Sequence, residues 1–573
     1  MSNEKLSENA LAITTDRYFM DNEDWTGMSE RVGSEVAIAE HNNRDEYTEK
    51  FSNMIYDMDF LPGGRILRNA RRARGSMFNC YVLPIGDSID EIGQFIKDAL
   101  ILWSEGGGVG CNFSSLRPRG ALIQGKGGTS SGPVSFLEAA DAVAKTIESG
   151  GSRRAAALAC MNVTHPDILE FIDSKLVHGR LSGFNISVAI TEAFLEAVEN
   201  GKEWQFKFAQ QNYGTVDARE VWDKIIRNMV ECAEPGLLNW NNVTSNNSYY
   251  FDPILATNPC GEATLGSYGI CDLGSLVLPN FITGTINTNW KKLEEVIRLA
   301  VRFLDDVIDV NKYALREVDI NAHNGRRIGI GVMGLAEYLF AKKLRYGSNK
   351  AVYEVERLMR FIRDTSYDES VALSIEKGSF PKYDTSSFSK AHFVRSLPAS
   401  QRRNIKEHGM RNVTTMAFAP TGTISLIPEV TSGIEPLFRK AYLRHDKISD
   451  RMYIHPLYKK ALKDHEDTPE WFVDTDDLKP EDHFETQAIV QKYVDGAVSK
   501  TVNMPAGTTV DELSKLTLEY IYDLKGVTVY VDGSREGQIL NKVSEGEVRD
   551  CLEKQKDTQA AEAISCAGGN CEL

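Results

Sequence analysis

Five cysteines of this chain have neighbours and spacings that could carry redox chemistry. They form three groups: Cys260 alone, then Cys80 and Cys271, which are isolated in the sequence, and finally Cys566 with Cys571. A stable globular core does not need a cysteine pair close to the end of a chain, whereas thiolate exchange with a distant disulfide needs a thiol that can travel. The grouping therefore indicates a reactive thiol, accessory thiols and a dithiol that is carried to them.

Cys260 lies in the segment Asn-Pro-Cys-Gly-Glu, with Asn258 and Glu262 each two residues away. If the segment is extended, these three side chains share one face and could meet one ligand. Pro259 and Gly261 favour instead a tight loop with Cys260 at its tip. A thiol between an amide and a carboxylate suits redox or proton chemistry on a hydroxylated substrate. From the residues alone, a buried cysteine in a turn is an equally good interpretation.

Cys80 and Cys271, each taken alone, are typical of buried structural cysteines. Cys271 follows Cys260 by eleven residues, a span that could cross a loop and return to the same site. Cys566 and Cys571 are separated by small residues, which let the two thiols approach one another. Half of a zinc site is the alternative, but tetrahedral zinc takes four ligands and no second cysteine pair exists. We therefore expect an exchangeable dithiol on a flexible tail.

Residues 419–425 have the composition of an anion-binding loop. Its hydroxyl, glycine and backbone positions are Thr421, Gly422, Thr423, Ile424 and Ser425. Backbone N–H groups and side-chain oxygens could hold a phosphate there, above all if a helix begins at this point. It is not a Walker loop, because no Gly-Lys-Ser/Thr follows. A simple capped turn is an equally good interpretation.

Two other glycine segments give weaker signals. Residues 150–154 read Gly-Gly-Ser-Arg-Arg, so that Arg153 and Arg154 could cover a nucleotide, although a solvated basic turn is the commoner case. Residues 106–110 read Gly-Gly-Gly-Val-Gly, which mainly predicts close backbone packing.

The composition bounds the class of protein. A chain of 573 residues with 42% hydrophobic and 25% charged residues is typical of a soluble globular enzyme with a large core. The net charge of −16 argues against nonspecific nucleic-acid binding. No apolar run is long enough to span a membrane, and the N-terminus lacks the features of a signal peptide. Nine cysteines, an odd count at wide spacing, suit a reducing cytosol, so we expect a cytoplasmic protein.

Three of the cysteines have no chemical context, and we expect them to be plain buried side chains: Cys111, Cys160 and Cys232.

The elements that must position these residues follow an α/β pattern. Residues 1–75 are predicted to be a mostly helical lead-in, residues 76–545 one continuous α/β domain, and residues 546–573 a helix followed by a mobile tail. Within the domain, residues 184–190 are predicted to form a strand, after which Thr191 caps a helix that ends near Gly201. The apolar periodicity predicts further helices over residues 134–147 and 293–308.

Taken together, these segments resemble the catalytic subunit of ribonucleotide reductase, most closely its class II, adenosylcobalamin-dependent branch. The matching stretches include residues 60–62, Cys80, 127–133, 150–154, 165–172, 256–262, 327–334, 420–425 and 525–530. They run in the family's order over roughly residues 60 to 535, and the terminal cysteine pair also matches.

The resemblance implies a ten-stranded α/β barrel of two five-stranded halves, with Cys260 on a central finger loop. By analogy Cys260 becomes a thiyl radical, Glu262 acts as base and Asn258 binds the sugar hydroxyls. Cys80 and Cys271 would supply two electrons and end as a disulfide. The tail pair Cys566 and Cys571 would reduce that disulfide, and thioredoxin or glutaredoxin would reduce the tail. Residues 421–425 would hold the substrate phosphates.

The resemblance also implies a homodimer with a specificity site for dNTP or ATP effectors. Asp87 and Arg117 match effector-binding positions, and Arg153 and Arg154 lie in the stretch matching the loop that couples effector to substrate. Alanines at 155–157 depart from the glycines often found there. Only 59 residues precede Phe60, so we expect no N-terminal ATP-binding regulatory domain and no overall on/off control by ATP and dATP.

The radical source separates the alternatives within the family. A class I large subunit receives its radical from a metal-containing partner through two adjacent tyrosines, and here the matching positions read Val529-Tyr530. Class III is disfavoured because the C-terminus lacks a glycyl-radical motif. No Asp-Xaa-His-Xaa-Xaa-Gly cobalamin motif is present, which is compatible with class II enzymes. A remote alternative of another class is a nucleotide-binding thiol redox sensor without turnover. Dimeric relatives favour diphosphate substrates.

Overall fold

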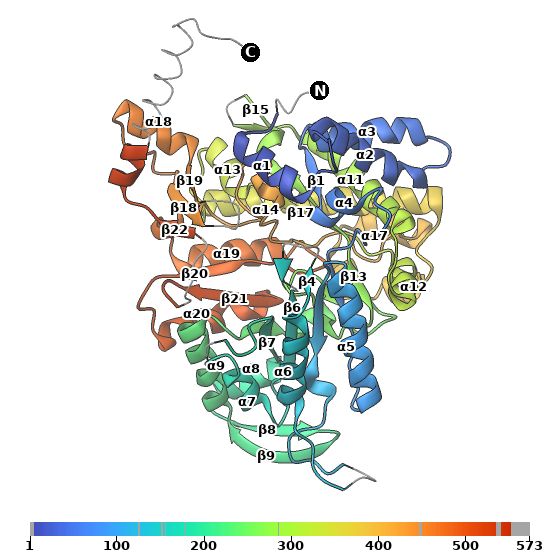
Figure 1. Ribbon diagram of the computed structural model, residues 1–573, viewed down its shortest axis with the longest axis vertical. Coiled ribbons are helices and arrows are strands. Elements are labelled where there is room, and N and C mark those ends of the chain that lie inside the picture. Colours follow the sequence, from blue (N-terminus) through green and yellow to red (C-terminus); the bar gives the residue numbers. More distant parts are fainter. Residues whose placement is uncertain are drawn as a thin grey trace, which may run out of the picture.

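Helices open the chain in the computed structural model, which describes residues 5–123, 127–149, 153–154, 156–177, 179–284, 286–445, 450–534 and 540–551. The first are α1 (Glu8–Arg17), α2 (Trp25–Val36) and α3 (Arg44–Tyr56), at the top of Figure 1. The Asp24 carboxylate accepts a hydrogen bond from the Gly27 N–H at 2.8 Å and so caps α2. Trp25 and Met28 of that helix are fully buried, which fixes the helical layer against the rest of the protein.

Five parallel strands follow in one continuous arrangement. In spatial order they are β2 (Cys80–Val82), β3 (Gly108–Asn112), β6 (Ala157–Asn162), β7 (Phe184–Ile190) and β10 (Gly236–Asn239). Most of their residues are buried on both faces, as expected for parallel strands covered by helices. Helices α5 (Ile89–Ser104), α6 (Pro133–Ala144) and α9 (Ala218–Cys232) lie beside them.

A second set of parallel strands meets the first at antiparallel junctions. β21 (Gly526–Val531) pairs antiparallel with β10 and parallel with β20 (Thr501–Met504). β13 (Gly269–Cys271) pairs antiparallel with β2, and β14 (Leu273–Val277) continues from it to pair parallel with β17 (Gly329–Met333). β14 also pairs antiparallel with β1 (Phe60–Pro62).

Residues 416–418 lie between the two sheets. Parallel bridges join Ile330 of β17 to Met416, and Phe418 to Val498 just before β20. The fold is therefore mixed α/β behind a helical N-terminal region, and short bridges connect the end of one sheet to the end of the other.

The sequence predictions for single elements agree closely with the structure. The predicted strand is β7, and the Thr191 hydroxyl caps α8 (Glu192–Glu199) by accepting a hydrogen bond from Phe194 N–H. The two predicted helices are α6 and α11 (Trp290–Val310).

Strict alternation of strands and helices fails after β16 (Asn287–Thr288). The longest helices follow there, α11 and α14 (Asn349–Lys377), and between residues 290 and 408 the described chain contributes only β17 to a sheet. These helices form a layer of their own with the N-terminal ones (Figure 1).

Two β-arms extend from this framework. The hairpin of β8 (Glu203–Phe208) and β9 (Gln211–Asp217) projects at the bottom of Figure 1. A second sheet, of β18 (Ala441–His445), β19 (Asp450–Ile454) and β22 (Leu540–Lys542), lies beside α18 (Pro456–Asp464). None of the helices described here has the length and apolar character needed to cross a membrane.

Candidate active site

Cys260 lies at the tip of a tight loop, so the loop interpretation is correct and the extended one is wrong. The short strands β11 (Ala256–Thr257) and β12 (Thr264–Leu265) form the base of this loop. Asn258 holds the loop closed with three hydrogen bonds. Its backbone N–H donates to Ala263 O at 3.1 Å, and its carbonyl accepts from Gly261 N–H at 3.0 Å. Its side-chain Oδ1 accepts from Ala263 N–H at 3.0 Å. Gly261 has φ +83°, a conformation that glycine adopts without strain. Cys260 is exposed.

The loop touches strands from both sets. A Cβ added to Gly110 of β3 would come within 1.9 Å of the Thr257 carbonyl oxygen, and one added to Gly108 within 2.9 Å of Pro259. On the other side, Ala497 N–H donates to the Glu262 carbonyl at 2.7 Å. The loop thus bridges β3 and the segment before β20, and the predicted role of the glycine run in close backbone packing is confirmed.

Asn258 and Glu262 are buried below the exposed thiol, 0% and 2% exposed. Within the described chain, neither Nδ2 of Asn258 nor Oε2 of Glu262 has a hydrogen-bond partner. Burial raises the pKa of Glu262 to about 7, and the neighbouring Asn258 amide opposes part of that shift. Buried polar groups are normally paired, so these two atoms are available to a ligand, and Glu262 can exchange a proton near neutral pH.

Cys80 and Cys271 are direct partners on the antiparallel strands β2 and β13. Cys271 is 1% exposed, whereas Cys80 is partly exposed. A Cβ on Gly108 would lie 3.0 Å from the Cys80 Sγ as well as against Pro259, so both sit over the same point of β3. Burial raises the pKa of Cys271 well above its usual range. The interaction with Cys80 and the charge of Glu262 raise this pKa further. The two isolated cysteines therefore meet beside the Cys260 loop.

Of the three cysteines expected to be plain buried side chains, Cys111 and Cys160 are completely buried. Cys232 is only partly buried, because it ends α9 at a turn.

A cavity of about 140 Å³ opens at Cys260 on the side of β10 and β21. Its polar lining comes from segments far apart in the sequence. It includes Asn185, Ser187, Glu234, Lys500 and Thr528. The exposed thiol thus faces a space distinct from the Cys80–Cys271 pair.

The predicted phosphate loop forms a tight turn rather than the start of a helix. It contains one 3-10 turn, η4 (Ile424–Leu426), because Thr421 has φ +54° and the chain turns back at once. The Thr421 hydroxyl accepts from Gly433 N–H at 2.8 Å, and Ser425 Oγ lies 3.0 Å from Ser432 Oγ. Gly422 is exposed and has open space around it.

Gly422 and Ser425 border the second cavity, of about 510 Å³. Tyr442 and Tyr453, paired on β18 and β19, stack with ring centroids 5.2 Å apart and line it. Arg439 also lines it, and its buried Nε has no hydrogen-bond partner in the described chain. The sequence analysis did not predict these two strands. The alternating pattern of Ala-Tyr-Leu-Arg at residues 441–444 and Arg-Met-Tyr-Ile at residues 451–454 is the signal that could have indicated them.

The two cavities adjoin along β20 and β21. Thr501 and Asn503 line the larger cavity, whereas Thr528, the strand partner of Thr501, lines the one at Cys260. Lys500, next to Thr501, donates to Glu435 at 2.6 Å, and Glu435 borders the larger cavity.

The structure pairs two of the predicted effector residues. The Asp87 carboxylate accepts hydrogen bonds from the Arg117 N–H at 2.9 Å and from its Nε at 2.8 Å. Arg153 and Arg154 form β5 (Arg153–Arg154), which pairs antiparallel with β4 (Glu148–Ser149). The tail cysteines Cys566 and Cys571 lie outside the described residues.

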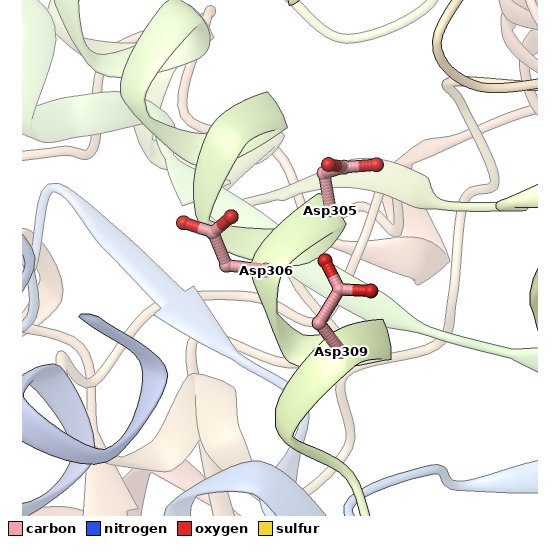
Figure 2. Close-up of side chains that lie close together, drawn as sticks. All are labelled: Asp305, Asp306 and Asp309. Atoms are coloured by element: carbon pink, nitrogen blue, oxygen red, sulfur yellow. The ribbon is translucent and has the colours of Figure 1, made fainter. Parts of the chain in front are cut away.

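Three aspartates on α11, Asp305, Asp306 and Asp309, lie close together (Figure 2). Their charges are met by side chains: Arg326 donates to Asp305 at 2.7 Å and to Asp309 at 2.8 Å. Lys377 donates to Asp306 at 2.6 Å. The cluster is therefore an ion-pair network that ties α11 to its neighbours, and a metal ion is not needed to account for it.

Two family models and several curated proteins match this chain. The family model "Ribonucleotide reductase, all-alpha domain" matches residues 4–75, and "Ribonucleotide reductase, barrel domain" matches residues 78–531. A vitamin B12-dependent ribonucleoside-diphosphate reductase of Mycobacterium tuberculosis is 36% identical over 99% of this chain and 84% of its own length. Its namesake in Thermoplasma acidophilum is 34% identical over 89% and 69%. A ribonucleoside-diphosphate reductase subunit alpha of Chlamydia trachomatis is 26% identical over 72% and 45%.

Proposed function

This chain belongs to the ribonucleotide reductase family, and we propose that it reduces ribonucleoside diphosphates to 2′-deoxyribonucleotides with adenosylcobalamin as cofactor. The observation that carries the proposal is the exposed Cys260 above buried, unpartnered atoms of Asn258 and Glu262, beside the Cys80–Cys271 pair. The B12-dependent reductases of Mycobacterium tuberculosis and Thermoplasma acidophilum are 36% and 34% identical to it, against 26% for the alpha subunit of Chlamydia trachomatis, which favours class II over class I.

The loop residues start the reaction on the ribose. Cys260, as a thiyl radical, takes the hydrogen atom from C3′. Asn258 Nδ2 donates a hydrogen bond to a sugar hydroxyl, and the Glu262 carboxylate takes the proton of the 3′-hydroxyl. A base with a pKa of about 7 is well matched to this task, because it is ionised at neutral pH yet still holds a proton strongly enough to remove one.

Cys80 and Cys271 supply the two electrons. As the 2′-hydroxyl leaves as water, the two thiols give up two electrons and two protons in total and join as a disulfide. Their direct pairing on β2 and β13 supports this role. The tail cysteines Cys566 and Cys571 then reduce the disulfide by exchange, and thioredoxin or glutaredoxin renews the tail.

We assign the two adjoining cavities to the cofactor, because one of them opens at Cys260 and the other continues beside it along β20. Adenosylcobalamin, when bound, supplies the radical equivalent that Cys260 needs. The space at Cys260 would hold its adenosyl end, and the larger cavity part of its corrin, with Tyr442 and Tyr453 as an apolar wall and the unpartnered Arg439 Nε as a donor. Residues 421–425 border the same cavity and would hold the substrate phosphates from the opposite edge.

The finer architecture and the partners are also part of the proposal. Five parallel strands from β2 to β10, five more from β21 through residues 416–418 to β14, and antiparallel junctions at both ends support a ten-stranded barrel around the Cys260 loop. Asp87, Arg117, Arg153 and Arg154 would form the specificity site for dNTP or ATP effectors in a homodimer.

The test is formation of deoxynucleotides from ribonucleoside diphosphates with dithiothreitol, with and without adenosylcobalamin. We expect product only when the cobalamin is present. Product that requires a metal-loaded partner subunit instead would move the chain to class I. Glu262→Gln separates an enzyme from a redox sensor, because nucleotide binding should survive while turnover is lost.

A further inference from the structure

Two ionisable side chains beside Cys271 are buried without partners. Arg327 is 7% exposed, yet in the described chain it has no ion pair and its Nη2 has no hydrogen-bond partner. Its guanidinium lies over the ring of Tyr249, 4.4 Å from the centroid. Asp272 is 1% exposed, and neither of its carboxyl oxygens has a hydrogen-bond partner there. Burial raises the pKa of the Asp272 carboxyl well above its usual range, which favours its protonated form. The charge of Arg327 is buried without a counter-charge, which is strongly unfavourable and needs a reason.

Arg327, Asp272 and Cys271 line one small space of about 10 Å³. That volume is about one water molecule, so no substrate or cofactor fits there. The ionisable groups that face Cys271 are Cys80, Glu262, Asp272 and Arg327. Only Arg327 is positively charged, and its charge favours the thiolate of Cys271 against burial and the other neighbours. When Cys271 is ionised, its thiolate therefore supplies the counter-charge that Arg327 otherwise lacks.

The exposure of the two sulfur atoms determines which of them an external thiolate can attack. Cys80 is partly exposed and Cys271 is 1% exposed, on directly paired strands. An incoming thiolate must approach a disulfide sulfur directly. It can therefore reach Cys80, and the sulfur that leaves is Cys271.

We propose that Arg327 is a positioning residue that stabilises Cys271 as the leaving thiolate when the Cys80–Cys271 disulfide is reduced, with Asp272 as the proton donor to it. The inference rests on the proposed function, since it assumes that this pair is the reducing dithiol. An external thiolate attacks Cys80 Sγ and forms a mixed disulfide. The Cys80–Cys271 bond breaks, its electron pair stays on Cys271 Sγ, and Asp272 gives that sulfur a proton. A second external thiolate then releases Cys80.

The direction of attack can be tested without any substitution near the pair. The full-length chain with Cys566→Ser and Cys571→Ser is oxidised with diamide, treated briefly with glutathione and quenched with acid. Peptide mass spectrometry then locates the glutathione. We expect it on Cys80, with Cys271 as a free thiol. Glutathione on Cys271 would overturn the proposal.

The role of Arg327 is tested by the rate of disulfide reduction by dithiothreitol between pH 6 and 9. Arg327→Met should slow reduction about three- to tenfold, because raising the leaving thiol's pKa by about one unit lowers the rate by at most tenfold, and it should change the pH profile. Arg327→Lys should restore most of the rate. Wild-type rates in Arg327→Met would refute the role.

Arg363→Met is the matched control. Arg363 is also buried, 5% exposed, and lies 5.0 Å over the ring of Tyr493, but it forms an ion pair with Asp364 at 2.6 Å and does not line the space at Cys271. Arg363→Met should destabilise the protein but leave the reduction rate unchanged, so that a slower rate in Arg327→Met is not a general effect of lost stability. Nucleotide reduction assayed in parallel separates the two hypotheses: if diamide forms the disulfide and glutathione maps as expected while deoxynucleotides are not made, the proposed function fails and the exchange direction stands.

Discussion

Gly110 of β3 lies directly beneath the carbonyl oxygen of Thr257, so close that a Cβ on residue 110 would be 1.9 Å from that oxygen. Real Cβ atoms do not approach an oxygen so closely, and the contact involves backbone on both sides. The position of the Cys260 loop therefore depends on the missing side chain of one glycine in a neighbouring strand.

Gly110→Ala should displace the loop and abolish most activity. The added methyl group must push the Thr257 carbonyl away, so Asn258 and Cys260 move relative to Cys80. We expect nucleotide reduction to fall by about 100-fold, since shifts of about 1 Å have such effects, with a loss of roughly 1–3 kcal/mol in stability. The measurements are turnover and thermal unfolding. Gly93→Ala, in α5 with nothing within 4 Å, is the control and should be neutral or slightly stabilising.

Glu262 should give kcat/KM an acid limb with a midpoint near pH 7. Burial raises its pKa to about 7, so below that pH the carboxyl is protonated and cannot accept the 3′-hydroxyl proton. The limb is measured in the wild type, and Glu262→Gln should abolish it together with activity. A midpoint near 4.5 would show that another group sets the pH dependence.

The same shift predicts that Glu262→Gln stabilises the protein above neutral pH. The folded-state pKa lies above the usual value of 4.5, so the native state binds more protons between about pH 4.5 and 7. Stability contributed by this group is therefore lost as pH rises through that window. A neutral Gln avoids that loss, on the order of 1–3 kcal/mol at pH 8. Comparing unfolding at pH 5 and pH 8 tests it: the gain should appear only at pH 8.

The sequence predicted elements and chemistry well where the signal was local. The strand at β7 and the cap at Thr191 follow from residues adjacent in the chain, and the loop at Cys260 follows from Pro259 and Gly261. The pairing of Cys80 with Cys271 depends on which strands lie side by side, and spacing alone does not give it. The resemblance to a family placed them together, and the register of β2 with β13 agrees.

Other features could not be predicted because they depend on distant side chains. Arg327 was visible only as part of a motif, and its isolation is evident only when the space around Cys271 is known. The phosphate loop was left open between a helix start and a capped turn, and Thr421 turns the chain back toward Gly433. Asp87 and Arg117 were predicted separately, and the structure joins them in an ion pair.

Counting products per chain tests the role of the tail. Prereduced enzyme without external reductant should form about two deoxynucleotides per chain, one from the Cys80–Cys271 dithiol and one after exchange with Cys566 and Cys571. Cys566→Ser should reduce the yield to about one, because a lone thiol cannot complete the exchange. Dithiothreitol, which can reduce the inner pair directly, should restore turnover in this variant. A yield of two in Cys566→Ser would exclude the tail as the internal reductant.

Arg439→Met should weaken cobalamin binding about tenfold or more, measured by calorimetric titration with hydroxocobalamin. The buried Nε of Arg439 has no hydrogen-bond partner in the described chain, and a bond from a charged donor contributes roughly 1.5–3 kcal/mol. Arg180→Met is the control, because Arg180 forms a surface ion pair with Glu138 and does not line the cavity. Gly422 and Ser425 border the same cavity. Weaker binding of nucleoside diphosphate with unchanged cobalamin affinity would therefore assign this space to the substrate phosphates instead.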